Sequence, residues 1–331
     1  MPGMLSPFGW GPLIHDWKLV PGWTVFSAVL LAGYLALWLR GRRLGDRSAH
    51  PARVGCWVLG LVVLVATVSS AIDTYAMSVF WVHMVEHLLL IMGVPALLVL
   101  GHPLSVVRAS VREEHRHRVD AVLQSWPVAV VTHPLVGMLF YAAVIVGTHL
   151  TGFMDQMVRH PWLMPAEQVL YVASGWLMLL TLIGDEPIRW RLPYLMRFGL
   201  VFVGMMPDTV VGIVLMQTNT NPFPLMFAQH PGWAPAPLRD LEIGGGLMWV
   251  VGDGLMMCYG VGLIVALAFG KTARNQVIGP WLESVRRQTL VDHVAASGDT
   301  EGYTGDDVDD DESALAAYNR MLARLNGQKQ A

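Results

Sequence analysis

The sequence predicts an all-α polytopic membrane protein with seven transmembrane helices, and three observations support this prediction. First, 54% of the 331 residues are hydrophobic and only 14% are charged, whereas soluble domains carry charge on about a quarter of their residues. Second, the mean hydropathy is +0.47, and the apolar residues gather in long runs. Third, the basic residues lie in short blocks between these runs, which is typical of membrane proteins.

Seven segments are long and apolar enough to cross a bilayer, which takes ~20 residues of helix. They cover residues 23–39, 54–72, 80–100, 128–149, 166–183, 198–216 and 243–269. We therefore expect three regions along the chain. These are an extracytoplasmic N-terminal segment (1–22) that does not resemble a cleaved signal peptide, a membrane domain (23–270), and a cytoplasmic tail (271–331).

The distribution of basic residues predicts the orientation of the helices. The sequence has 22 Lys and Arg residues, and nineteen of them follow the first, third, fifth or seventh segment. The other three are Lys18, Arg159 and Arg239. Because Lys and Arg concentrate in cytoplasmic loops, we expect the N-terminus outside the cell and the C-terminus in the cytoplasm.

Two stretches on the expected cytoplasmic side lie outside the spans. Residues 105–125 mix valines with Arg, Glu and His, so we expect a helix lying in the membrane interface. In the tail, residues 298–313 are rich in Asp and are predicted to be disordered. A short helix is expected after them, over 313–326, because the pattern SALAAYNRMLARLN ends at a glycine.

Composition also excludes several classes of function. A net charge of −3 argues against nucleic acid as a partner. The two cysteines, Cys56 and Cys258, fall in different spans and form no CxxC pair, which argues against a disulfide framework or a cysteine-based metal site. The sequence contains no recognisable pairing of a nucleophile with a base, so a hydrolase is the least favoured class.

The third segment begins FWVHMVEHLLL and carries a histidine pair. His83 and His87 are four residues apart, so they lie one turn apart on one helix face, and Glu86 flanks them. Ionisable groups inside a membrane cost roughly 2.5–3.5 kcal/mol on insertion scales, so they mark candidate functional sites. Zinc hydrolases also use the spacing H-x-x-E-H, but no third ligand follows here. We predict metal or proton chemistry, against the alternative of two packed histidines bonded to carbonyls.

Further His and carboxylate side chains are expected at the same depth, near the outer boundary of the membrane. A rim of this composition suits a divalent transition metal. The predicted metal ligands are His83, His87 and His149. The predicted further ligands or hydrogen-bond partners are Glu86 in the third segment, His160 and Asp240 in the outer loops, and Glu167 at the start of the fifth segment.

Two carboxylates are expected deeper in the membrane. Asp208 and Asp253 lie ~12–15 Å below the outer ends of the sixth and seventh segments, at ~1.5 Å per residue. We expect them at one depth on adjacent helices, either as an ion site or as a hydrogen-bonded helix contact. Pro207 is predicted to interrupt the helical hydrogen bonds there. The 19 methionines add thioethers, which favour Cu(I) but also serve as pliable packing.

Two blocks of sequence resemble a known family. HMVEHLLLIMGVPALLVLGHPL, in the third segment, is similar to the H-M-x-x-H-L-L-L…P…L-L-x-L-G-x-P block of the CtaG-like bacterial cytochrome c oxidase assembly proteins. RDLEIGGGLMWVVGDG resembles that family's D-x-x-x-G-G-x-x-M-W segment at the last helix. The seven-helix layout agrees, and the resemblance covers residues 20–270.

The resemblance implies a non-enzymatic assembly factor that handles or delivers copper at the outer side of a bacterial cell (inner) membrane. Cytochrome c oxidase subunits and copper chaperones are the implied partners, and copper is the implied cofactor. His83 and His87 match the family's paired histidines, and Asp240 matches its aspartate. The family commonly has a Glu-His pair at the start of the fifth helix, where this sequence has Glu167 and Gln168.

Two other functions are compatible with the same residues. In a haem-binding electron-transfer protein, His83 or His87 would pair with His149 across a haem, and the purified protein would absorb visible light. In a proton-coupled transporter, Asp208 and Asp253 would form the relay, and substrate flux would be measurable. The sequence has no internal repeat of the kind that many transporters show.

Overall fold

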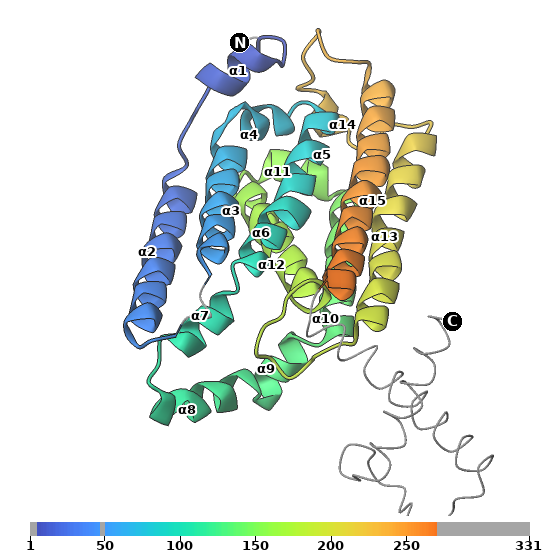
Figure 1. The fold of residues 1–331 in the computed structure, drawn as a ribbon. Coiled ribbons are helices and arrows are strands. Elements are labelled where there is room, and N and C mark those ends of the chain that lie inside the picture. Colours follow the sequence, from blue (N-terminus) through green and yellow to red (C-terminus); the bar gives the residue numbers. More distant parts are fainter. Residues whose placement is uncertain (1–4, 47–49, 270–331) are drawn as a thin grey trace, which may run out of the picture. The chain divides into compact units, whose positions relative to one another are not determined.

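The computed structural model describes residues 5–46 and 50–269, and in these residues every regular element is a helix (Figure 1). The chain divides into two units, Met1–Leu263 and Ile264–Ala331, and the first contains every residue of the site. The predictions for the tail, 271–331, lie outside the described residues.

The helices of the first half are α1 (Trp10–His15), α2 (Pro21–Arg43), α3 (Pro51–Ser69), α4 (Ala71–Ala76), α5 (Phe80–Leu88), the π-helix η1 (Leu89–Gly93), α6 (Val94–Leu100), α7 (Pro103–Ala109), α8 (Glu113–Leu123) and α9 (Trp126–Val131). Those of the second half are α10 (Pro134–His149), α11 (Phe153–Arg159), α12 (Leu163–Leu182), α13 (Tyr194–Gln217), α14 (Pro224–Phe227) and α15 (Pro237–Phe269).

The predicted spans correspond to helices. Within the described residues, six helices are long and apolar enough to cross a membrane, and the run from Phe80 to Ala109 counts as one of them. A seventh is reached if α10 and α11, which meet at 66°, are taken as one bent span. The all-α class and the multi-pass membrane character are therefore confirmed, and the orientation stays a prediction.

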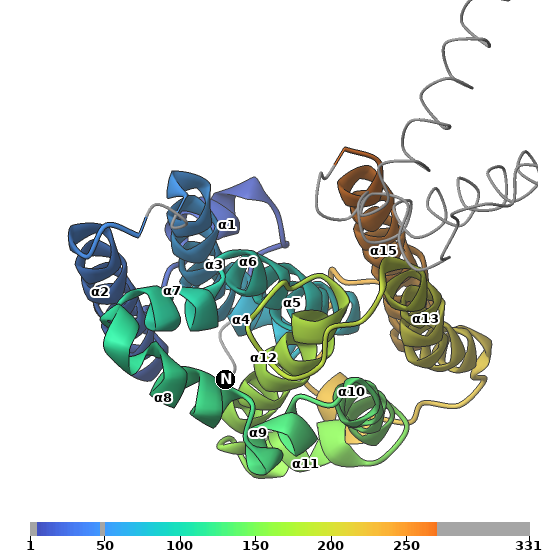
Figure 2. The same ribbon diagram turned by 60° about the horizontal axis from the view of Figure 1, so that its bottom comes forward.

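The run α5–η1–α6 is the central helix of the membrane domain. In its most apolar stretch 72% of the residues are buried, against 17–44% in the other candidate spans of the described chain. Helix α6 packs against α3 and α12, and α12 also packs along η1 and α10. Figure 2 shows α5 and α6 with α3 on one side and α12 alongside. The histidine pair of α5 is thus enclosed by neighbouring helices.

A proline explains the π-helical turn below the histidines. Pro95 has no N–H, so it cannot donate to the carbonyl of Ile91, four residues earlier. The backbone widens there into η1, and such turns occur frequently at functional sites. Gly175 of α12 packs on this carbonyl so closely that a Cβ atom at Gly175 would collide with the oxygen of Ile91. A glycine at position 175 therefore lets α12 approach the histidine-bearing helix.

Helices α13 and α15 also make close backbone contact through glycines. A Cβ atom on Gly212 would lie 2.7 Å from the carbonyl oxygen of Gly245, and one on Gly245 would lie 2.6 Å from that of Gly212. Small residues allow this approach between membrane helices. Pro207 lies inside α13, which stays helical on both sides of it rather than breaking.

The structure changes two local expectations. The segment 105–125 is divided among α7, α8 and the link between them, because α7 ends at Ala109 and Glu113 starts a new helix. Glu186, which follows α12, accepts hydrogen bonds from the N–H groups of Leu104 and Ser105 at the start of α7. The last helix begins at Pro237 instead of residue 243, so Asp240 belongs to its first turn.

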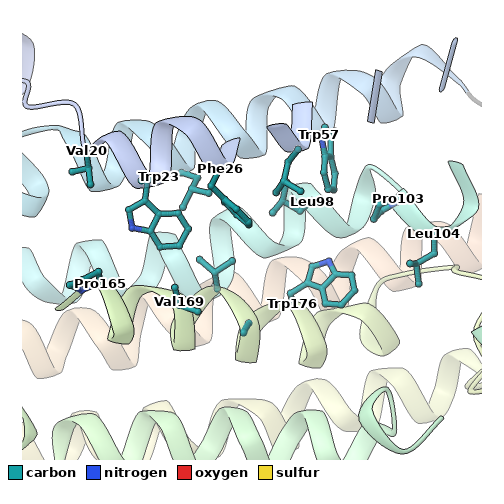
Figure 3. A pocket seen from close by; sticks show the side chains of 15 residues that line it. Val20, Trp23, Phe26, Trp57, Leu98, Pro103, Leu104, Pro165, Val169 and Trp176 are labelled. Carbon is teal, nitrogen blue, oxygen red and sulfur yellow. The ribbon is translucent and has the colours of Figure 1, made fainter. Parts of the chain in front are cut away.

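An apolar groove runs between α2, α3, α6 and α12 (Figure 3). Its volume is ≈ 640 Å³, and its walls include Trp23, Trp57 and Trp176. Every residue that lines it is apolar, so hydrocarbon chains suit it and it offers no catalytic or ligating group.

Candidate functional site

Three histidines from two helices lie together at the end of the membrane domain where α5 begins and α10 ends. We call His83, His87 and His149 the histidine trio. The ring centroids of His87 and His149 are 4.9 Å apart, and those of His83 and His149 are 6.1 Å apart. All three side chains are almost completely buried. The predicted i, i+4 pair therefore meets the predicted third histidine.

Most of the ring nitrogens in the trio have no hydrogen-bond partner in the described part of the chain. This holds for both nitrogens of His83, both of His87, and Nε2 of His149. The Nδ1 atom of His149 lies 3.0 Å from the carbonyl of Ile145, which fixes the ring. Buried polar atoms are rarely left unpaired, so five such nitrogens in one cluster call for an explanation.

Glu167 and Tyr171 of α12 close one side of the trio. Nε2 of His83 is 3.8 Å from a carboxylate oxygen of Glu167, and the hydroxyl of Tyr171 donates to the other oxygen at 2.7 Å. The ring of Tyr171 also packs on His87, with centroids 4.6 Å apart. Thr148 continues this network, because its hydroxyl lies 3.2 Å from that of Tyr171 and 2.8 Å from Nδ1 of His149.

Gln168 of α12, next to Glu167 in the sequence, forms hydrogen bonds with three other side chains. Its amide nitrogen donates to Asp73 and to Glu86, each at 2.8 Å, and its oxygen accepts the indole N–H of Trp23 at 2.8 Å. Asp73 lies between two spans, and burial raises its pKa. The second carboxylate oxygen of Glu86 is buried without a partner among the described residues. Gln168 thus holds Glu86 in place beside the histidine pair.

Asp240 has a role that its predicted loop position did not suggest. One carboxylate oxygen accepts the N–H of Phe80 at 2.7 Å and the other accepts that of Trp81 at 2.9 Å. These N–H groups start α5 and have no partner within the helix. Nε2 of His230 lies 3.1 Å from the same carboxylate. Asp240 therefore fixes the first turn of the helix that carries His83.

His160 lies apart from these networks. It follows the last residue of α11, and its side chain is exposed. In the described residues no contact joins it to the histidine trio. His149, in contrast, lines a pocket of ≈ 390 Å³ that includes Thr151, Thr218 and Pro222. This pocket therefore lies beside the trio, on the side of His149.

The two deeper carboxylates lie on adjacent helices, as predicted. Asp208 of α13 is completely buried, and one of its oxygens accepts the hydroxyl of Tyr141 at 2.6 Å. Asp253 of α15 accepts the hydroxyl of Thr209 at 2.8 Å. Asp208 also lies against Gly252, the neighbour of Asp253. Each carboxylate is therefore bonded to a hydroxyl of its own, and whether the two form one site stays a prediction.

The structure adds residues that sequence reasoning missed. Tyr171 and Thr148 connect the trio to Glu167, and Asp73 and Trp23 hold Gln168. Two of these had a local signal, because Tyr171 is four residues from Glu167 and Thr148 is next to His149.

The histidine trio is not arranged as a closed metal centre. In the described chain no group of three or more His, Cys, Asp and Glu side chains is close enough to hold a metal ion. The ring positions put the three imidazoles in contact without converging on one point. A metal bound here would require a change in side-chain rotamers.

Comparison with known families gives a match over most of the chain. The model of the family described as "Cytochrome c oxidase caa3 assembly factor" matches residues 32–268. This range includes all three histidines, both deeper carboxylates and the glycine contacts of α12, α13 and α15.

The relatives found among curated proteins are uncharacterised mycobacterial proteins. One from Mycobacterium leprae is 31% identical over 232 residues, which are 67% of this chain and 35% of that protein. Proteins of Mycobacterium bovis and Mycobacterium tuberculosis are each 29% identical over 308 residues, 91% of this chain and 43% of theirs. The chain thus spans less than half the length of these relatives. No solved structure matches it.

Proposed function

Because this chain belongs to the cytochrome c oxidase caa3 assembly factor family, we propose that it handles copper for a haem-copper oxidase at the histidine trio. The observation that supports this function most directly is the set of five buried ring nitrogens without partners. Neutral imidazole nitrogens are good ligands for copper. A bound metal would satisfy them, whereas two simply packed histidines would be expected to bond to neighbouring carbonyls.

The residues around the trio fit a metal that enters and leaves. Ligating histidines need hydrogen-bond partners for their other nitrogens, and Ile145 already serves His149 in this way. Glu167 is 3.8 Å from His83 and can take up this role after a small rotation. Because the three imidazoles do not converge on one point, binding a metal requires reorganisation of their side chains. A site of this kind holds copper less tightly than a rigid one and favours transfer.

Access and location support the same function. The pocket lined by His149 lies at the end of the membrane domain rather than at its middle. The distribution of basic residues in the sequence predicts that this end lies outside the cytoplasm. We propose that a copper chaperone and the cytochrome c oxidase subunits are the donor and acceptor there, in the inner membrane of a bacterium.

The test combines copper binding with oxidase assembly. We expect His83→Ala and His87→Ala to abolish copper binding by the purified protein and to lower the level of assembled oxidase in cells. Insertion and folding should persist because the apolar spans are unchanged. His115→Ala and His117→Ala, in α8, are matched controls and should have no effect. Normal copper content and oxidase levels in the His83 and His87 variants would refute the proposal. Visible haem absorbance that is lost in these variants would favour electron transfer instead.

Orientation needs a separate experiment. Cysteines introduced at His160 and His230 should react with a membrane-impermeant thiol reagent in intact cells, and one at His115 should not. The native Cys56 and Cys258 are first replaced by serine. Labelling at position 115 alone would place the histidine trio on the cytoplasmic side and exclude delivery at the outer face.

A further inference from the structure

Three methionines from three helices converge in the interior of the membrane domain. They surround Gly204 of α13, at the point that a Cβ atom would occupy if this residue had one. The nearest atoms to that point are the methyl carbon of Met256 at 3.3 Å, the methyl carbon of Met138 at 3.5 Å and the sulfur of Met178 at 3.8 Å. These residues belong to α15, α10 and α12. The glycine therefore leaves room in which the ends of methionine side chains from three separate helices meet.

A buried carboxylate lies one helical turn away. Asp208 follows Gly204 by four residues on α13, so both lie on the same face of the helix. The side chain of Asp208 has no exposed surface, and its Oδ2 atom accepts the hydroxyl of Tyr141. Its Oδ1 atom is buried and has no hydrogen-bond partner in residues 5–46 and 50–269. A carboxylate oxygen left unpaired in this environment is costly.

Packing alone explains only part of this arrangement. Methionine fills irregular gaps, and three of them around a glycine would be an ordinary core. Packing does not explain why a buried carboxyl group lies one helical turn from this glycine with one oxygen unpaired. Thioethers are soft ligands that select Cu(I), and a carboxylate supplies the negative charge that compensates a monovalent cation. The combination of soft ligands and one compensating charge matches Cu(I) better than a hard divalent ion.

We infer that Met138, Met178, Met256 and Asp208 form a second Cu(I) site, deeper in the membrane domain than the histidine trio. Helix α10 connects the two sites, because it carries His149 at its end and Met138 eleven residues earlier, about 16 Å along the axis. Tyr141, on the same helix, holds Asp208 in position. Only the choice of copper rests on the proposed function.

The test measures copper stoichiometry and ligand type in the full chain. The purified protein in lipid nanodiscs is loaded anaerobically with Cu(I) in the presence of a competing chelator, and X-ray absorption then reports sulfur and nitrogen ligands. We expect one Cu(I) at each site. The variant Met138→Leu/Met178→Leu/Met256→Leu should lose one Cu(I) and the sulfur ligands. Leucine matches methionine in volume, so the fold should be kept.

Matched variants separate this site from the histidine trio. Met92→Leu/Met154→Leu/Met157→Leu changes three buried methionines elsewhere and should keep full loading and the sulfur signal. His83→Ala/His87→Ala should lose one Cu(I) but keep the sulfur ligands. Asp208→Asn should weaken the deeper site by about 10–100-fold, the range seen when groups that support a metal site are removed.

Each result has a distinct meaning. Full loading and unchanged spectra in the triple Met138, Met178 and Met256 variant would overturn the inference, as would equal loss in the control triple variant. Loss of copper in the Met138, Met178 and Met256 variant, together with full loading in the histidine variant, would support the deeper site. The same result would refute the proposed function of the trio. Absence of Cu(I) from the wild-type protein would overturn both.

Discussion

Gln168 is the residue where a single substitution tests the organisation of the site most sharply. Its side-chain amide makes three hydrogen bonds, to Asp73, Glu86 and Trp23. A neutral imidazole has one donor and one acceptor, so Gln168→His can replace at most two of them. Gln168→Leu can replace none. The two substitutions therefore remove different numbers of the same interactions.

The expected cost follows from the burial of the partners. Trp23 and Glu86 are 9% and 3% exposed, so water cannot readily replace the lost amide. A buried polar group left unpaired costs about 1–3 kcal/mol, which gives about 2–6 kcal/mol for the two partners in Gln168→Leu. Gln168→His leaves at least one of the three groups unpaired and should cost about 1–3 kcal/mol. Asp73 is closer to the surface and adds less.

The assay is thermal unfolding of the detergent-purified protein, with Gln156→His as the control because Gln156 is exposed in α11. At ~2–4 °C per kcal/mol, Gln168→Leu should lower Tm by at least about 4 °C. The order of Tm should be wild type, then Gln168→His, then Gln168→Leu, with the control equal to wild type. If Gln168→Leu has the same Tm as the wild type, the Gln168 amide does not stabilise this hydrogen-bond network and the reasoning fails.

Two other substitutions test how the helices around the site are held. Gly245→Ala should destabilise the protein by about 1–3 kcal/mol, because its new methyl group would meet the backbone of Gly212. The control is Gly254→Ala on the same helix, whose methyl group meets nothing within 4 Å and which should be neutral or stabilising. Equal melting temperatures for the two variants would contradict the close packing of α13 and α15. Asp240→Asn should cost about 1–3 kcal/mol, since one of its two acceptor oxygens at the start of α5 becomes a donor. Glu242→Gln, two residues away and partly exposed, is its control, and similar losses in both would argue against a specific capping role.

The sequence alone determined the class of the protein and the residues worth examining. A bilayer requires ~20 apolar residues per span, a constraint so strong that six of the seven predicted segments correspond to membrane-length helices among the described residues. The fourth segment, 128–149, is divided between α9 and α10. The pair His83 and His87 was recognisable because helical spacing is local. The resemblance to an oxidase assembly family was confirmed by the match over residues 32–268. The orientation and the copper ligands remain predictions.

Only the tertiary structure decided which side chains meet. His149 comes to His87 from another helix, Gln168 reaches Trp23 across 145 residues, and Asp240 holds the start of α5 across 160. Membrane helices such as α10 and α12 are apolar around most of their circumference, so the sequence does not indicate how each helix is rotated about its axis. That rotation is fixed by packing, through contacts such as Gly175 against Ile91. The partners of every buried polar group depend on it.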